Sequence, residues 1–329
     1  MWAHRPSGWR EAASWALLLV ALAAMGWALR HADLSHAWSA IVQTPAWVWA
    51  LSVGGLVCSH LLRAARVRLE WSQQLAMTWP QAWALIVGHA FWTILIPMRA
   101  GEAYYVLSLH QRAGIAPASA IWSLLRLRTQ DMSIVGSMAV LAIWPVALGL
   151  KALVLLVMVT VLAFGEPYLW KAVAWIKRRQ APMSGQPMAP PWRLWALACA
   201  NWCVKLSSLA LVLHALTDAD WQAALAGALG GEFGAAMPLQ PPVGVGTYEA
   251  GVVAFHSLVR HPELDLASAL KQHGPHFLVA ALVMHLVVVG VTLVSGLAAR
   301  LTGLHATPMA VRPTASGMVP HTKSNDTPT

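Results

Sequence analysis

Arg99 and Glu102 lie between two apolar stretches, in the segment IPMRAGEAYY. A guanidinium group matches a phosphate with two parallel hydrogen bonds, and a carboxylate three residues away would orient that phosphate or exchange with it. Residues three apart also share a helix face, so the two side chains would equally well neutralise each other. The segment therefore predicts an anion site or a local ion pair, and both interpretations stay open.

A second group of charges lies in the segment LLRLRTQDM. Arg128 and Asp131 are three residues apart and are expected to pair on one helix face. Arg126 points about 200° away from Arg128 on an ideal helix, so it needs a different partner, in a loop or among headgroups. The alternative is that this turn lies at the membrane interface, where arginine side chains extend toward water.

Lys205 lies in the middle of the apolar segment LACANWCVKLSSLALVL. A charge at the centre of a bilayer costs about 2.5–3.5 kcal/mol on insertion scales, so such residues pair, face the protein interior or mark a pathway. Lys205 is too far from either end of its segment to reach the interface. We expect it to pair with Glu232 or Glu249, as part of an anion site or as a structural ion pair.

Glu249 follows the segment GVGTY and begins another apolar stretch. Thr247 is positioned to cap a helix there, with Glu249 in its first turn, where negative charge is favoured. The functional alternative is that Glu249 takes up a proton or pairs with Lys205 during transport. His285 and His89, each within an apolar segment, are expected to form hydrogen bonds between helices; the alternative is that they carry protons.

The composition is that of an integral membrane protein. Of the 329 residues, 58% are hydrophobic and 11% are charged, whereas soluble domains carry about 25% charged residues. The net charge of +9 comes from basic residues at the ends of apolar segments, which favours cytoplasmic loops and anionic headgroups over nucleic acid as their surroundings. No nucleotide-binding, metal-ligand or nucleophile–base motif is present, so we expect no metal and no cofactor.

The apolar segments predict an all-α polytopic fold in a single transmembrane domain, residues 1–302, with halves at about 12–144 and 148–300. Six full spans are expected at about 12–29, 45–64, 116–144, 148–170, 193–216 and 275–299. Two further apolar regions, about 80–112 and 221–260, are broken by proline and glycine. The residues from 303 to 329 are expected to form a disordered tail.

Lysine and arginine in the short loops place both termini in the cytoplasm. The two broken regions would then be hairpins that enter from opposite sides. Both breaks run from an apolar-Pro-apolar start to a glycine and then a glutamate, at Glu102 and Glu249. Opposed, broken segments in corresponding places indicate an inverted-repeat transporter with a site near the midplane. The alternative is two unrelated loops at the membrane surface.

The two breaks also carry a resemblance to a known family. The segment IPMRAGEAYYVLSLHQRAGIAPASAIWSLLRLRTQDM resembles the flippase-like, lysylphosphatidylglycerol synthase transmembrane-region family, with its proline, arginine, Gly-Glu pair, Gly-Ile and Arg-x-x-Asp in order. The segment MPLQPPVGVGTYEAGVVAF resembles the proline, Gly-x-Gly and glutamate segment of the same family. The likeness covers roughly residues 10–300, although prolines stand here where the family's second break is richer in glycine.

The resemblance implies movement of an anionic phospholipid or lipid-linked intermediate between leaflets of a bacterial-type inner membrane. A partner enzyme of lipid or polysaccharide synthesis is also conceivable, and the alternative function is a membrane-embedded enzyme or a scaffold. Without a soluble domain after Thr302, aminoacyl transfer is not expected. The candidate substrate-binding residues are Arg99, Glu102, Arg128, Asp131, Lys205 and Glu249. The candidate hinge residues are Pro97, Gly101, Pro238, Gly244 and Gly246.

Overall fold

The computed structural model describes residues 34–96, 101–143, 147–176, 191–237, 241–260 and 266–312, together with positions 19, 23 and 30. Within these ranges the regular structure is helical, and no strand is present beyond a single β-bridge. The expected first span, at about 12–29, lies almost wholly outside the described residues. The all-α prediction is confirmed, while the number of spans stays a prediction.

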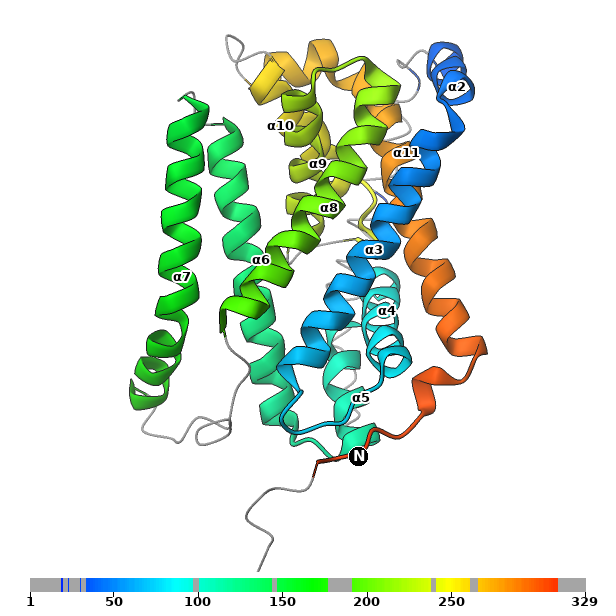
Figure 1. Ribbon diagram of the computed structural model, residues 1–329. Coiled ribbons are helices and arrows are strands. Elements are labelled where there is room, and N and C mark those ends of the chain that lie inside the picture. The colour runs from blue at the N-terminus through cyan, green and yellow to red at the C-terminus, as the bar shows by residue number, and fades with distance from the viewer. Residues whose placement is uncertain are drawn as a thin grey trace, which may run out of the picture.

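Long helices form the frame of the molecule (Figure 1). They follow a short helix, α2, and comprise α3, α6, α7, α8 and α11. Their bounds are Leu34–Gln43 for α2, Ala46–Glu70 for α3, Pro117–Ile143 for α6, Leu148–Ile176 for α7, Pro191–Thr217 for α8 and Leu266–Leu301 for α11. Among the described residues, α3, α8 and α11 are long and apolar enough to cross a membrane.

The first broken region is a pair of shorter helices, α4 (Trp79–Leu95) and α5 (Ala103–Ala113). Helix α4 begins with a reciprocal capping box between Thr78 and Gln81, which satisfies two of the free amides at the helix start. Helix α5 ends at Gly114, whose φ of 66° suits glycine. The break between them was predicted correctly, but residues 97–100 lie outside the described ranges, and Pro97 and Arg99 with them.

The second broken region consists of α9 (Trp221–Ala236), the 3₁₀ turn η2 (Pro242–Gly244) and α10 (Thr247–Arg260). Helices α9 and α10 pack with their backbones almost in contact. A Cβ added to Gly251 would lie 2.1 Å from the carbonyl oxygen of Gly230, and one added to Gly234 would lie 2.1 Å from that of Thr247. Small residues of this kind let membrane helices approach closely.

The two hairpins occupy different ends of the helical frame. Figure 1 shows α4 and α5 in the lower half of the view and α9 and α10 in the upper half, with α3, α8 and α11 running past both. Helix α8 packs along α3, and the α6–α7 pair lies to one side. The described ends of α4 and α9, next to the two breaks, line one common cavity.

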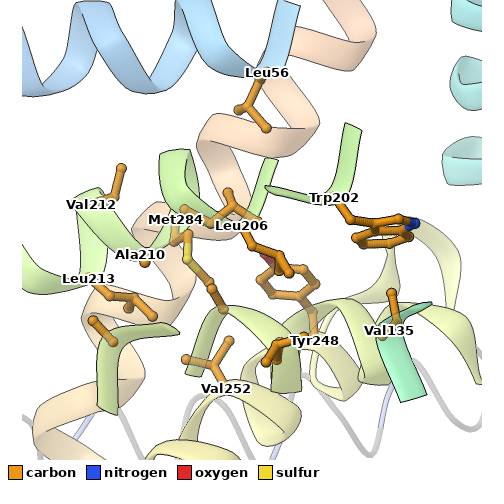
Figure 2. Packing of buried hydrophobic residues seen from close by; sticks show 14 of the residues in the cluster. Leu56, Val135, Trp202, Leu206, Ala210, Val212, Leu213, Tyr248, Val252 and Met284 are labelled. Atoms are coloured by element: carbon orange, nitrogen blue, oxygen red, sulfur yellow. The ribbon is translucent and has the colours of Figure 1, made fainter. Parts of the chain in front are cut away.

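The main hydrophobic core surrounds α8 (Figure 2). Leu206 of α8, Tyr248 of α10 and Met284 of α11 are each at most 1% exposed, and the close-up shows their side chains converging. A second core lies under the first hairpin, around Trp71 and Tyr105, whose side chains share a hydrogen bond of 2.9 Å. Each hairpin is thus supported by its own core.

Part of the expected disordered tail is ordered. After α11 the chain forms the 3₁₀ turn η3 (Leu304–Ala306), buries Met309 in the second core and makes a β-bridge between Val311 and Leu75. Arg112 at the end of α5 donates to the carbonyl oxygens of Thr307 and Leu304, at 2.9 and 3.1 Å. The tail prediction therefore fails for residues 304–312, because Met309 and these carbonyl groups anchor the segment; residues 313–329 lie outside the described ranges.

Candidate functional site

A cavity of about 150 Å³ lies where the two hairpins meet. Its walls come from α3, α4, α6, α8, α9, η2, α10 and α11, so both broken regions contribute to it. The ionisable side chains among the described lining residues are His60, Arg63, His89, Arg128, Asp131, Lys205, Glu232, Tyr248 and His285. Apart from the histidines, three of these are arginine or lysine and two are carboxylates, so the lining favours an anion.

Arg128 joins α6 to the first hairpin. Its Nη2 atom lies 3.1 Å from Oε1 of Glu102 and also 3.1 Å from Nε2 of His89. The side chains of Arg128 and Glu102 are 24% and 27% exposed, so neither is sealed in the interior. The hydrogen-bond and ion-pair contacts described for Arg128 are with a glutamate and a histidine of the hairpin, while Asp131, the partner expected from spacing, bonds to other residues.

Asp131 is held by other elements. Its Oδ1 accepts from Nη1 of Arg66 at 2.6 Å and from Nε1 of Trp202 at 3.1 Å. Arg66 also donates to the carbonyl oxygen of Leu127 and to Oε1 of Gln130. With these bonds the buried arginine meets three acceptors on α6, which indicates a structural clamp between α3 and α6 on one wall of the cavity.

Arg126 has the separate partner that its angular position required. Its Nη1 lies 2.8 Å from Oε2 of Glu70, and both side chains are buried. Sequence reasoning missed Arg66 and Glu70 because it placed residues 63–79 in a cytoplasmic loop. Helix α3 in fact continues to Glu70. One signal was available in the sequence. Positions 66 and 70 carry one arginine and one glutamate, and positions 126 and 131 carry one arginine and one aspartate, so the four charges can form two ion pairs.

Lys205 pairs with Glu232, as one of the two predicted alternatives. Its Nζ lies 2.6 Å from Oε2 of Glu232, and the two side chains are 18% and 7% exposed. The amine also lies 5.4 Å from the ring centroid of Trp202, within range of a cation–π contact. Both members of the pair line the cavity, so the pair joins α8 to the second hairpin at the cavity wall.

Glu249 does not pair with Lys205. Its Oε2 accepts from the backbone amide of Gly246 at 2.7 Å, and its Oε1 lies 2.6 Å from Nδ1 of His285. The carboxyl group is 1% exposed and lies behind His285, which itself lines the cavity. The predicted hydrogen bond of His285 between helices is confirmed. Glu249 holds the backbone amide of Gly246 at the break of the second hairpin.

The candidate hinge glycines have two different roles. Gly244 and Gly246 have φ angles of 80° and 87°, a region that side chains disfavour. Gly101 permits close approach, since a Cβ there would lie 2.2 Å from the backbone carbonyl group of Trp92. Val243, which sequence reasoning did not single out, also has a positive φ of 63°, although it is β-branched. Pro238 lies outside the described residues.

Three polar atoms on the cavity lining have no hydrogen-bond partner among the described residues. They are Oε1 of Glu232, the hydroxyl group of Tyr248 and Nδ1 of His60. All three residues are buried, at 7%, 1% and 7% exposure. A buried polar atom without a partner costs about 1–3 kcal/mol. These atoms therefore indicate that the cavity is built for a polar group.

The comparison with family models agrees with this architecture. The model described as the lysylphosphatidylglycerol synthase TM region matches residues 14–283. The chain belongs to that family. Membership in the lysylphosphatidylglycerol synthase TM region family confirms the resemblance carried by the two breaks, and it links this membrane protein to lipid or cell-envelope biosynthesis. A search of the curated proteins finds no match.

Proposed function

We propose that the protein moves an anionic phospholipid or lipid-linked intermediate between the leaflets of a bacterial-type inner membrane. The observation that carries the proposal is the position of Arg128 on the cavity wall, in contact with Glu102 and His89 of the first hairpin. A guanidinium group matches phosphate as well as carboxylate. A lipid phosphate would displace Glu102 from Arg128, and the released hairpin would be free to move.

The second hairpin supplies the other side of the proposed headgroup site. Lys205 of the neighbouring α8 brings positive charge there, and the unpartnered atoms of Glu232 and Tyr248 in the hairpin offer an acceptor and a donor to a polar headgroup. Non-helical backbone at membrane depth is tolerated only where protein or water satisfies it. Two broken hairpins around one polar cavity fit an inverted-repeat transporter with a central site.

The membrane orientation is part of the same proposal. We infer from the basic loops that both termini lie in the cytoplasm, so that the first hairpin would enter from the cytoplasmic side and the second from the opposite side. Alternating movement of the two hairpins would open the cavity to one leaflet at a time. Three helices of the frame, α3, α8 and α11, would stay fixed during that movement.

The proposal is tested with the purified protein in vesicles that carry a fluorescent anionic phospholipid in both leaflets. A membrane-impermeant quencher bleaches only the outer leaflet unless lipids cross. We expect the protein to make nearly all of the anionic probe accessible, and to do so faster than for a zwitterionic probe. Equal behaviour of protein-free and protein-containing vesicles would refute transport. A chemically altered lipid formed in detergent would point instead to a membrane-embedded enzyme.

A further inference from the structure

His285 lies between two hydrogen-bond acceptors. Its Nε2 is 3.0 Å from the carbonyl oxygen of Val243, and its Nδ1 is 2.6 Å from Oε1 of Glu249. A carbonyl oxygen can only accept, so Nε2 must carry a proton and donate it. The ring is also stacked on Tyr248, with centroids 4.3 Å apart, which fixes its orientation.

The contact between His285 and Glu249 holds one further proton. If the carboxyl group is ionised, Nδ1 donates and the imidazole is a cation; if the carboxyl group is protonated, it donates to Nδ1. Both arrangements contain the same number of protons. Without that proton, one N–H group would face two acceptors, and either the Glu249 contact or the Val243 contact would break.

The Val243 contact lies at the break of the second hairpin. Val243 has a φ of 63°, a conformation that is unfavourable for a β-branched residue and persists only when its surroundings hold it. His285 holds its carbonyl group, and Glu249 holds the amide of Gly246 on the other side of the turn. The proton count of the two side chains thus controls the anchor at Val243, while Glu249 accepts from Gly246 in either state.

His285, the member of the pair that lines the cavity, also faces the charges of the proposed headgroup site. His285 and the ionisable groups of the neighbouring elements line one cavity; those groups are His60 and Arg63 of α3, His89 of α4, Arg128 and Asp131 of α6, Lys205 of α8, Glu232 of α9 and Tyr248 of α10. An anionic headgroup that enters this cavity favours retention of a proton on His285, because opposite charges attract more strongly in a poorly solvated interior.

We propose that Glu249 and His285 form a proton-binding unit that couples lipid movement to a proton gradient. One proton travels with each anionic headgroup: the loaded unit keeps the break of the second hairpin closed, and loss of the proton on the other side releases Val243. Lipid anion and proton move together, so the cycle transfers no net charge. This coupling rests on the proposed lipid transport.

The coupling predicts how lipid distributes under a pH gradient. A gradient of about one pH unit is a tenfold ratio of proton activity, so coupling of one proton to one lipid enriches the anionic probe about tenfold in the leaflet on the alkaline side. The measurement uses vesicles with the membrane potential clamped at zero. The Glu249→Gln variant should lose the enrichment, while Arg193→Gln, at an exposed position away from the cavity, should keep it.

Two outcomes separate this inference from the proposed function. Lipid movement by the wild type without any enrichment under the gradient overturns the coupling and leaves lipid transport intact. If the wild type moves no lipid, infrared titration of the purified protein still tests the proton site. We expect Glu249→Gln and His285→Asn to remove one and the same titrating signal. Removal of two separate signals would show that the residues do not share a proton.

Discussion

Arg128 of α6 and Glu102 at the start of α5 lie 3.1 Å apart, and each side chain is about a quarter exposed. The contact closes the first hairpin against the helical frame. Partly exposed ion pairs of this kind contribute about 0.2–1 kcal/mol, which is small enough for a ligand phosphate to replace the carboxylate. In the proposed mechanism, Arg128 is therefore the point where headgroup binding and hairpin movement would meet.

Replacement of Glu102 by glutamine should strengthen lipid binding. The substitution removes the carboxylate that competes with a phosphate for Arg128, so we expect the affinity for a short-chain anionic lipid to rise by up to about fivefold, the equivalent of the upper value for a partly exposed pair. Equilibrium binding in detergent measures the change. Unchanged or weaker binding would mean that Glu102 does not compete with the ligand.

Lys205 and Glu232 give a test of stability. Lys205→Met leaves the mostly buried Glu232 carboxylate without its cation, and loss of one partner of a buried pair typically costs about 3–5 kcal/mol. The double variant Lys205→Met with Glu232→Gln leaves no lone charge and should recover most of that loss. Thermal unfolding in detergent compares the three proteins. A double variant as unstable as Lys205→Met would show that the charge imbalance is not the cause.

Glycine substitutions test the contact between α9 and α10. Gly251→Ala would place a methyl group 2.1 Å from the carbonyl oxygen of Gly230, so the helices must separate and we expect a loss of at least about 1–3 kcal/mol. Gly136→Ala is the matched control, since nothing lies within 4 Å of its added Cβ. There alanine should stabilise α6 by up to about 1 kcal/mol. Similar effects at both positions would argue against close backbone packing.

Asp220 gives a test of pH dependence outside the membrane-spanning segments. The amide of Ala223, which donates to its carboxylate at 2.9 Å, and then Arg260 at 2.7 Å lower the pKa of Asp220. Because the folded pKa is below the unfolded value of about 3.9, the contribution to stability is complete above that value and is lost as the pH falls through the folded pKa.

The corresponding variant is Asp220→Ala, which removes the cap of α9 and should cost about 1 kcal/mol near neutral pH. Asp220→Asn keeps a capping oxygen and should lose less. Unfolding curves at several pH values compare each variant with the wild type. The difference between wild type and Asp220→Ala should shrink below about pH 4; a difference that stays constant in acid would contradict a role for the ionised carboxylate.

The breaks and the main helices could be predicted from the sequence because proline, glycine and apolar runs act locally. Both hairpin breaks lie in the expected places. Lys205 pairs with Glu232, which was one of its two predicted partners. The partners of Asp131 and Arg126 could not be predicted from spacing alone. They are Arg66 and Glu70, at sequence separations of 65 and 56 residues, and only the tertiary fold brings the long side chains of α3 and α6 together.

The ordered end of the chain shows the same limit. The composition after residue 302 indicates disorder, yet Met309 is buried beneath the first hairpin and Arg112 holds the carbonyl groups before it. A single buried side chain and a few backbone hydrogen bonds suffice to order such a segment, and neither leaves a periodic pattern. Val243 was missed for a similar reason, since its positive φ arises from contacts with α11.

The central claim is that the anionic headgroup passes by Arg128. The most direct measurement is the rate of anionic lipid movement in vesicles containing Arg128→Gln, compared with Arg193→Gln, an exposed arginine that does not line the cavity. Loss of a charged hydrogen bond costs about 1.5–3 kcal/mol, so we predict a rate reduced by at least about tenfold for Arg128→Gln and unchanged for Arg193→Gln. Equal rates in the two variants would contradict the account.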